Sequence, residues 1–164
     1  MGNKKGSFST GSGVGDNLGE ALKEAQNVAR ARIEKFDLYN DKTIFHDVTA
    51  SHMRQTVQIV RQPEGYGVRG SILFRYLCQM VGLTDVYIKN PNKCSRPSSK
   101  VNKLKAFQLA LRSLENPQQL ADRTGFHVVE MDELDWDKPK IVAEPSGFEQ
   151  GDDDHLLQKI KNYK

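Results

Sequence analysis

The sequence predicts an α+β fold, and three segments in its first half carry that prediction. Thr56–Gln62 alternates polar and apolar side chains, as a half-buried strand does. Ser71–Val81 is apolar nearly all round, which predicts a helix that is buried on more than one side. The stretch between them, RQPEGYGVRG, is rich in glycine and contains a proline, so it predicts a turn that leads directly into the helix.

A long amphipathic helix and a short strand are expected before this region. A basic Gly/Ser-rich stretch leads into a helix that Asp16 or Asn17 can cap, and apolar residues recur at helical spacing as far as Phe36. After a polar turn, Thr43–Val48 is predicted as a strand. A loop that contains His52 then joins it to the main strand.

Strands and helices are expected to continue after the apolar helix. Gly82 is placed to end that helix, and Thr84–Lys89 is predicted as a short strand. A basic loop, Asn90–Lys100, precedes another helix, which Ser98 or Ser99 can cap. The predicted core stripe of this helix consists of Val101, Leu104, Phe107, Leu111 and Leu114, and its predicted outer face of Lys105, Gln108 and Arg112.

The C-terminal part is predicted to hold a short helix, a strand and an acidic arm. Asn116 and Pro117 occupy the cap and first position of a helix that Gly125 ends. Phe126–Met131 is typical of a strand. Beyond it, the acidic, proline-containing tail is expected to be an extended surface arm with a terminal helix at Asp154–Tyr163.

Charge is distributed unevenly along the 164 residues. Lysine and arginine number 24 against 21 aspartate and glutamate residues, which gives a net charge of only +3. The acidic residues gather towards the C-terminal end, from Glu130 to Asp154. Without that end the remaining chain is strongly basic, and this favours a polyanionic partner.

The sequence predicts no catalytic, metal or cofactor site. The histidines, at positions 46, 52, 127 and 155, are not spaced as a metal-binding pair. Cys78 is expected in the core, and Cys94 lies in a basic loop without a base or a resolving cysteine. Gly11–Gly15 (GSGVG) lacks the Lys-Ser/Thr that follows a nucleotide loop, so a flexible or turn-forming segment is expected. No apolar run approaches the roughly 18 residues that a membrane span requires.

Cations on helix faces and in loops are the predicted RNA-binding groups. A dispersed set of cations binds a nucleic acid backbone without reading sequence. The aromatic residues do not form a stacking platform for single strands, which favours recognition of folded RNA by shape. Arg69 and Arg75 also flank a helix start, which suits phosphate. The predicted contacts are Lys23, Arg30, Arg69, Arg75, Lys105 and Arg112, and the turn residues expected to face RNA are Gly65, Tyr66 and Gly67. The alternative is an ordinary solvated surface.

Several separated motifs resemble the ribosomal protein S5 family of the small ribosomal subunit. In chain order they are TIFHDV at Thr43–Val48, the QPEGYGVRG turn, GLTDVY, VNKL at Val101–Leu104, and QQLADRTGFHVVE. The forms IFHDV, PEGYG, QQLAD and HVVE are similar to the mitochondrial branch in animals. The resemblance covers about residues 2–145.

This resemblance implies a fold in two parts. The first is a double-stranded-RNA-binding-like unit, to which residues 1–40 contribute only the last strand and helix. The second, residues 41–131, is a two-layer βαβα unit whose crossover has the uncommon left hand. Residues 132–164 form the acidic arm. Compared with the family, the strands expected before Gly2 are missing, and the usual glycine–lysine step is absent around Gly13–Asp16.

The resemblance also implies a function. The implied protein is a structural constituent of the mitochondrial small ribosomal subunit. It is expected in the mitochondrial matrix, bound to small-subunit ribosomal RNA. The expected neighbours are S4-like and S8-like proteins, near the messenger RNA entry path and the decoding region. One alternative is a free-standing module that binds structured RNA. A weaker one is an enzyme, since small-molecule kinases share the second unit's topology, but PEGYGVRG lacks the serines of their phosphate loop.

Overall fold

The computed structural model describes residues 1–91, 100–130 and 140–146, and its contacts divide the chain into two compact units, Met1–Leu114 and Glu115–Lys164. The described residues of each unit include both helix and strand, so the predicted α+β class is confirmed. The domain boundaries expected near residues 40 and 131 remain a prediction. None of the described helices is long and apolar enough to cross a membrane.

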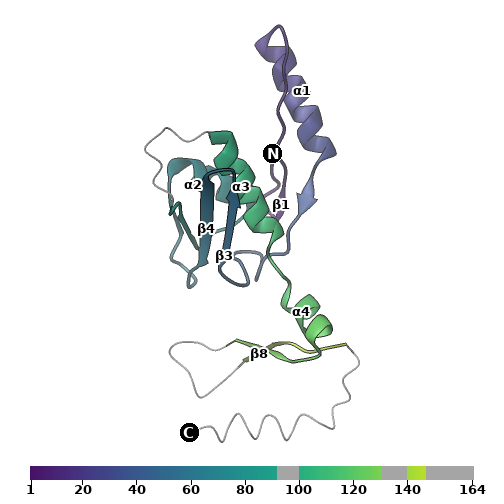
Figure 1. The fold of residues 1–164 in the computed structure, drawn as a ribbon, viewed down its shortest axis with the longest axis vertical. Helices are drawn as coiled ribbons and strands as arrows, with labels where there is room; N and C mark the ends of the chain where they lie inside the picture. Colours follow the sequence, from purple (N-terminus) through teal and green to yellow (C-terminus); the bar gives the residue numbers. More distant parts are fainter. Residues whose placement is uncertain (92–99, 131–139, 147–164) are drawn as a thin grey trace, which may run out of the picture. The chain divides into compact units, whose positions relative to one another are not determined.

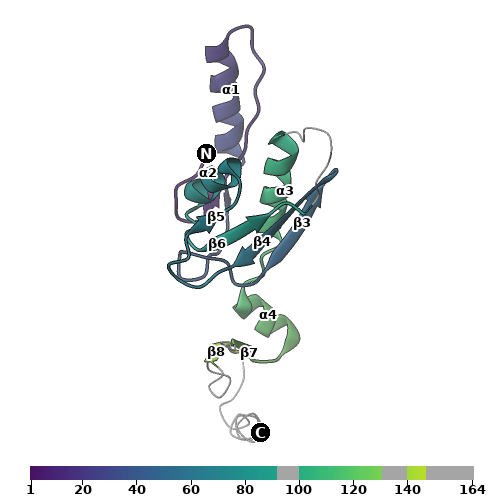
Figure 2. The same cartoon turned by 90° about the vertical axis from the view of Figure 1, so that its left-hand side faces the viewer.

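A four-stranded sheet is the centre of the first unit (Figures 1 and 2). Its strands are β3 (Val48–His52), β4 (Gln55–Arg61), β5 (Val68–Arg69) and β6 (Val86–Lys89), in the order β3-β4-β6-β5. β4 pairs antiparallel with β3 and with β6, whereas β5 and β6 are parallel. The predicted alternation in the main strand is confirmed, because Gln55, Val57 and Ile59 are buried and the residues between them are half-buried.

The strand before β4 begins later than the sequence predicts. The prediction placed it at Thr43–Val48, whereas β3 runs over Val48–His52 and pairs Ala50 with Val57. Besides Val48, only Thr43 in the predicted segment makes a β-bridge. Ile44 is nevertheless completely buried. The apolar pattern of this segment therefore reflects the burial of irregular chain, and His52 ends a strand instead of lying in a loop.

Helix α2 (Ile72–Val81) has the predicted ends but only one buried side. Ser71 stands at the N-cap, and Gly82 ends the helix with φ 103° while donating its N–H to the carbonyl of Cys78 (2.8 Å). The side chains in the core are Phe74, Leu77, Cys78 and Val81. Ile72 and Tyr76 are 71% and 61% exposed, so within the described chain the expected burial on more than one side is wrong.

Helix α3 (Lys100–Arg112) packs against β3 and β4 and meets α2 through aromatic rings. The ring of Phe107 lies 6.1 Å from that of Phe74, measured between centroids. The predicted core stripe is confirmed for Phe107 and Leu111, but Val101 is 57% exposed. Ala106 and Ala110 are completely buried in its place. Their small side chains let the helix lie close to the sheet, which an apolar pattern alone does not reveal.

In the sequence, helix α1 (Leu18–Ala31) connects two short strands, β1 (Ser7–Phe8) and β2 (Glu34–Lys35), which pair antiparallel with each other. Its predicted start is confirmed, with Asn17 in the N-cap position. The helix ends before Phe36, because that side chain is buried in the core and its N–H donates to the carbonyl of Gly6 (2.8 Å).

The GSGVG stretch runs alongside α1 and packs against the helix backbone (Figure 1). A Cβ on Gly11 would lie 2.1 Å from the carbonyl oxygen of Ala25, and one on Gly13 would lie 2.3 Å from that of Ala21. A spacing of two residues places side chains on the same side of an extended chain. The stretch is therefore a packing segment, not the flexible or turn-forming one expected.

The second unit contains α4 (Pro117–Thr124) and the antiparallel strands β7 (Val128–Glu130) and β8 (Lys140–Ala143). The predicted helix ends are confirmed, since the side chain of Asn116 accepts from the N–H of Gln118 (3.0 Å) and Gly125 has φ 71°. β8 lies within the segment predicted as an extended arm. Most of the Asn90–Lys100 loop, Ser98 and Ser99, Cys94, and the predicted helix Asp154–Tyr163 lie outside the described residues.

We expect Gly13→Ala to lower the free energy of unfolding by about 1–3 kcal/mol, because the added methyl group overlaps the backbone of α1. Gly19→Ala is the matched control. Its Cβ meets nothing within 4 Å, and alanine is favoured over glycine in a helix by up to about 1 kcal/mol. Denaturant unfolding followed by circular dichroism measures both changes. Equal stability of the two variants would contradict the packing role of the GSGVG stretch.

Candidate RNA interface

Two of the predicted RNA contacts lie on α1. Lys23 and Arg30 are both exposed, and their separation of seven residues is close to two helical turns, so they project from one face. Neither forms an ion pair with any residue in the described ranges. Arg30 also stands in the last turn, where the helix dipole favours a cation. Both side chains are thus accessible to a large anionic partner.

The PEGYG turn has the backbone conformation that its glycines suggest. Gly65 and Gly67 have φ values of 86° and 75°, in the left-handed region. A Cβ at either position would meet nothing within 4 Å. The backbone conformation, and not crowding within this chain, therefore accounts for the two glycines.

A buried carboxylate anchors this turn to the sheet. Asp85 precedes β6 and accepts the N–H of Gly67 (2.9 Å) and the hydroxyl of Thr84 (3.1 Å). One arginine follows this turn at a distance of two residues. The guanidinium of that residue, Arg69, lies 4.3 Å from the ring centre of Tyr66.

The turn adjoins a second aromatic–cation pair on β6. Arg69 is in register with Tyr87, and the ammonium of Lys89 lies 5.0 Å from the ring centre of Tyr87. Tyr66, Arg69, Tyr87 and Lys89 thus form a small cluster of cations and rings. Tyr87 was not predicted as a site residue, and Lys89 was not among the six cations predicted to contact RNA. Tyr87 and Lys89 are two residues apart in a predicted strand, and this spacing indicates that their side chains lie on the same face of the sheet. Arg75, on α2, is exposed.

The predicted cations on α3 differ in their surroundings. Lys105 is exposed and forms no ion pair with a described residue. Arg112, in contrast, donates from Nε to Glu34 Oε2 (2.8 Å), and its second nitrogen donates to the other carboxylate oxygen. Hydrogen bonding from Arg112 holds the pKa of Glu34 below its usual value, an effect that partial burial opposes and Gln108 reinforces. Arg112 is therefore already engaged in the free chain.

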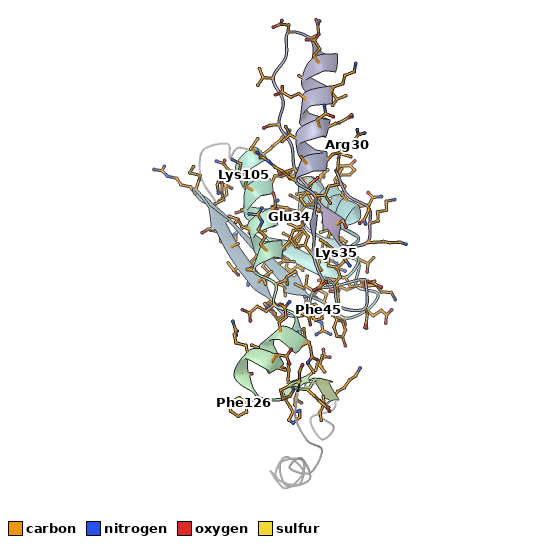
Figure 3. The ribbon with its side chains drawn as sticks, turned by 90° about the vertical axis from the view of Figure 1, so that its right-hand side faces the viewer. Arg30, Glu34, Lys35, Phe45, Lys105 and Phe126 are labelled. Atoms are coloured by element: carbon orange, nitrogen blue, oxygen red, sulfur yellow. The ribbon has the colours of Figure 1, made fainter. Side chains whose placement is uncertain are left out.

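A shallow depression brings several of these groups together. It has a volume of about 530 Å³ and lies where β2, the end of β3 and α3 meet. Figure 3 shows Lys105 on α3 and Glu34 on β2, which both contribute to its walls. The polar and charged lining residues are Thr10, Arg32, Glu34, His52, Lys105, Gln108 and Arg112. Arg32 was not among the six cations predicted to contact RNA, because no local pattern shows that it would lie beside α3.

Cys78 is buried in the core, as the sequence predicts. Burial raises the pKa of the Cys78 thiol to about 12, so the thiol stays protonated and is a poor nucleophile. In the part of the chain that the structure describes, no group of three or more His, Cys, Asp or Glu side chains is arranged to hold a metal ion.

Residues 50–124 match the family described as ribosomal protein S5, C-terminal domain, a range that runs from β3 to α4. The chain is 31% identical over 150 residues to small ribosomal subunit protein uS5m of Bos taurus, which is 90% of this chain and 33% of that protein. It is 30% identical over 129 residues to uS5m of Caenorhabditis elegans, covering 79% of this chain and 29% of that protein.

A bacterial relative is also similar. Small ribosomal subunit protein uS5 of Mycoplasmopsis agalactiae is 30% identical over 122 residues, which is 74% of this chain and 51% of that protein. The chain spans about a third of the length of the animal relatives that it matches.

We expect the Glu34–Arg112 pair to make stability fall at acid pH. Because the folded-state pKa of Glu34 is lowered, its contribution is complete above the ordinary glutamate value of about 4.3. It is lost as the pH falls through the lowered value. For an exposed ion pair, the contribution to the free energy of unfolding is about 0.2–1 kcal/mol. Glu34→Gln and Arg112→Ala should each remove the same part of the acid dependence in urea unfolding, and independent effects of the two changes would contradict the coupling.

Proposed function

The chain belongs to the ribosomal protein S5 family, in its mitochondrial branch, and on this premise we propose that it is a structural constituent of the mitochondrial small ribosomal subunit. Its place is the mitochondrial matrix, where it binds small-subunit ribosomal RNA during mitochondrial translation. The observation that carries this proposal is the similarity to animal uS5m, which extends over 90% of the chain.

The exposed cations supply the RNA contacts in this proposal. We assign phosphate contacts to the six predicted cations and an RNA-facing position to the turn Gly65–Gly67. The contacts proposed are Lys23, Arg30, Arg69, Arg75, Lys105 and Arg112. Exposure of Lys23, Arg30, Arg75 and Lys105 supports this assignment. For Arg112, contact with a phosphate requires exchange of its bonds to Glu34. The proposed neighbours are S4-like and S8-like proteins, near the messenger RNA path and the decoding region.

The finer architecture is part of the same proposal. Residues 1–40 belong to a double-stranded-RNA-binding-like unit, residues 41–131 are the βαβα unit and residues 132–164 are the acidic arm. The presence of α1 beside the short strands β1 and β2 supports the first assignment. The parallel strands β5 and β6 are joined through α2. A strand–helix–strand connection between parallel strands is either right-handed or left-handed. We assign this connection the left hand of the family.

The proposal is non-enzymatic. The family to which the chain belongs consists of ribosomal proteins.

Sedimentation tests the proposed function directly. Tagged protein from fractionated mitochondria is expected to comigrate with small-subunit ribosomal RNA on a sucrose gradient. A slow-sedimenting peak that stays separate from this RNA would overturn the proposal and favour the free-standing RNA-binding module. Treating the lysate with ribonuclease before the gradient provides the control, because it should release the protein from the fast fraction.

We expect Gly67→Val to impair incorporation into the subunit more than Gly125→Val. The two glycines have φ values of 75° and 71° with open space at the Cβ position, so the two changes cause similar backbone strain. That strain costs on the order of 1–2 kcal/mol, and closeness to RNA would add a steric conflict at Gly67 alone. Gly19→Ala is a second, unstrained control. Quantitative incorporation of Gly67→Val with normal decoding accuracy would show that PEGYG is an ordinary surface turn.

A further inference from the structure

The depression beside α3 has an excess of positive charge. Its charged lining consists of Arg32, Lys105 and Arg112 against a single carboxylate, Glu34. These groups come from the end of α1, from β2 and from α3, so only the folded chain assembles them. A concave surface with one sign of charge attracts and retains ions of the opposite sign more strongly than a flat surface does.

Within the depression, Glu34 is the centre of a hydrogen-bond network. Its two carboxylate oxygens accept from the guanidinium of Arg112, and Gln108 also donates to it. The amide oxygen of Gln108 in turn accepts the hydroxyl of Thr10 (3.0 Å). Since its fork-shaped donors match a carboxylate, Arg112 is held in a bidentate pair.

The other two cations are differently placed. Arg32 and Lys105 are exposed and form no ion pair with any described residue. Arg32 lies directly after α1, so its side chain is carried by a capped helix end and not by a long loop. Lys105 is fixed on α3, whose neighbouring residues Ala106 and Phe107 are completely buried. Two rigid elements therefore present one free cation each to the same hollow.

We propose that this depression is a docking site for an RNA backbone phosphate, which Arg32 and Lys105 bind while Glu34 keeps Arg112 away from it. The inference rests on the proposed function and makes it specific. It places Arg32 among the RNA contacts in place of Arg112, whose guanidinium stays bound to Glu34, and it assigns Glu34 the role of limiting how many cations the RNA engages. The guanidinium of Arg32 offers a bidentate donor pair to phosphate oxygens, and Lys105 supplies a point charge.

The salt dependence of RNA binding tests this site. The full chain is titrated with a transcript of the small-subunit ribosomal RNA at several potassium chloride concentrations, and the slope of log affinity against log salt is compared between variants. Arg32→Ala and Lys105→Ala should each reduce the magnitude of the slope by about 0.7–0.9, the value of one phosphate contact. Lys35→Ala is the matched control, because Lys35 is exposed on β2 but does not line the depression (Figure 3).

A substitution that is expected to strengthen RNA binding tests the role of Glu34. Glu34→Gln should strengthen binding and increase the slope by up to about 0.9, because Arg112 becomes available to the RNA. Glu20→Gln, on α1 and outside the depression, alters the net charge equally and should leave the slope unchanged. Circular dichroism of each variant checks that the fold is retained.

The outcomes separate this inference from the proposed function. Normal binding by the unmodified chain with unchanged slopes in Arg32→Ala and Lys105→Ala would overturn the site and leave the proposed function standing. Absence of binding by the unmodified chain would overturn both. A third arm replaces RNA by inorganic phosphate and follows the amide signals of Arg32 and Lys105 by NMR. Saturable phosphate binding without any effect of the variants on RNA slopes would identify a free-anion site and also overturn the proposal.

Discussion

Burial of Phe107 between Phe8 and Phe74 is the contact on which the rest of the first unit depends. Each neighbouring ring lies 6.1 Å from that of Phe107, one almost perpendicular at 88° and the other tilted at 32°. Aromatic side chains bury a large apolar area, and such pairs add about 0.5–1.5 kcal/mol beyond burial alone. The three rings come from β1, α2 and α3. Their contact joins segments that are far apart in the sequence into one core.

This core also determines where charged groups meet. Once Phe8 is buried, β1 is fixed beside α3, and β2 pairs with β1. Glu34 on β2 is thereby placed opposite Arg112. The ion pair itself is exposed and contributes little to stability. The ion pair instead changes the charge of the depression. Glu34 neutralises Arg112, whereas Arg32 and Lys105 form no ion pair with a described residue.

Two aspartate carboxylates of the first unit accept hydrogen bonds from backbone N–H groups. Asp85 accepts the N–H of Gly67, and Asp47 accepts the N–H of Arg61 (2.7 Å). A carboxylate that bonds backbone donors stabilises a turn or a strand end without occupying a lysine or arginine side chain. Residues 1–114 are basic because lysine and arginine outnumber aspartate and glutamate there, although the net charge of the whole chain is only +3. This excess of positive charge favours a polyanionic partner.

Local signals in the sequence determined much of the fold. The alternation around Val57, the caps of α2 and α4, and the glycine turn depend on short-range sterics and hydrogen bonds, which neighbouring residues specify. They also supported the family resemblance, because its motifs are contiguous stretches. Where the local pattern was ambiguous, as at Thr43–Val48, burial of irregular chain produced the same apolar signal as a strand.

Long-range packing decided the remainder. No local pattern shows that Gly13 lies against Ala21, that Phe36 leaves the helical pattern to enter the core, or that β2 runs beside α3. The candidate site depends on such contacts. The sequence predicted Lys105 and Arg112 as cations on one helix face. It did not reveal that Glu34 binds Arg112 or that Arg32 and Lys105 line the same depression. Charge pairing across distant segments is set by the positions of their backbones, and only the tertiary structure provides those.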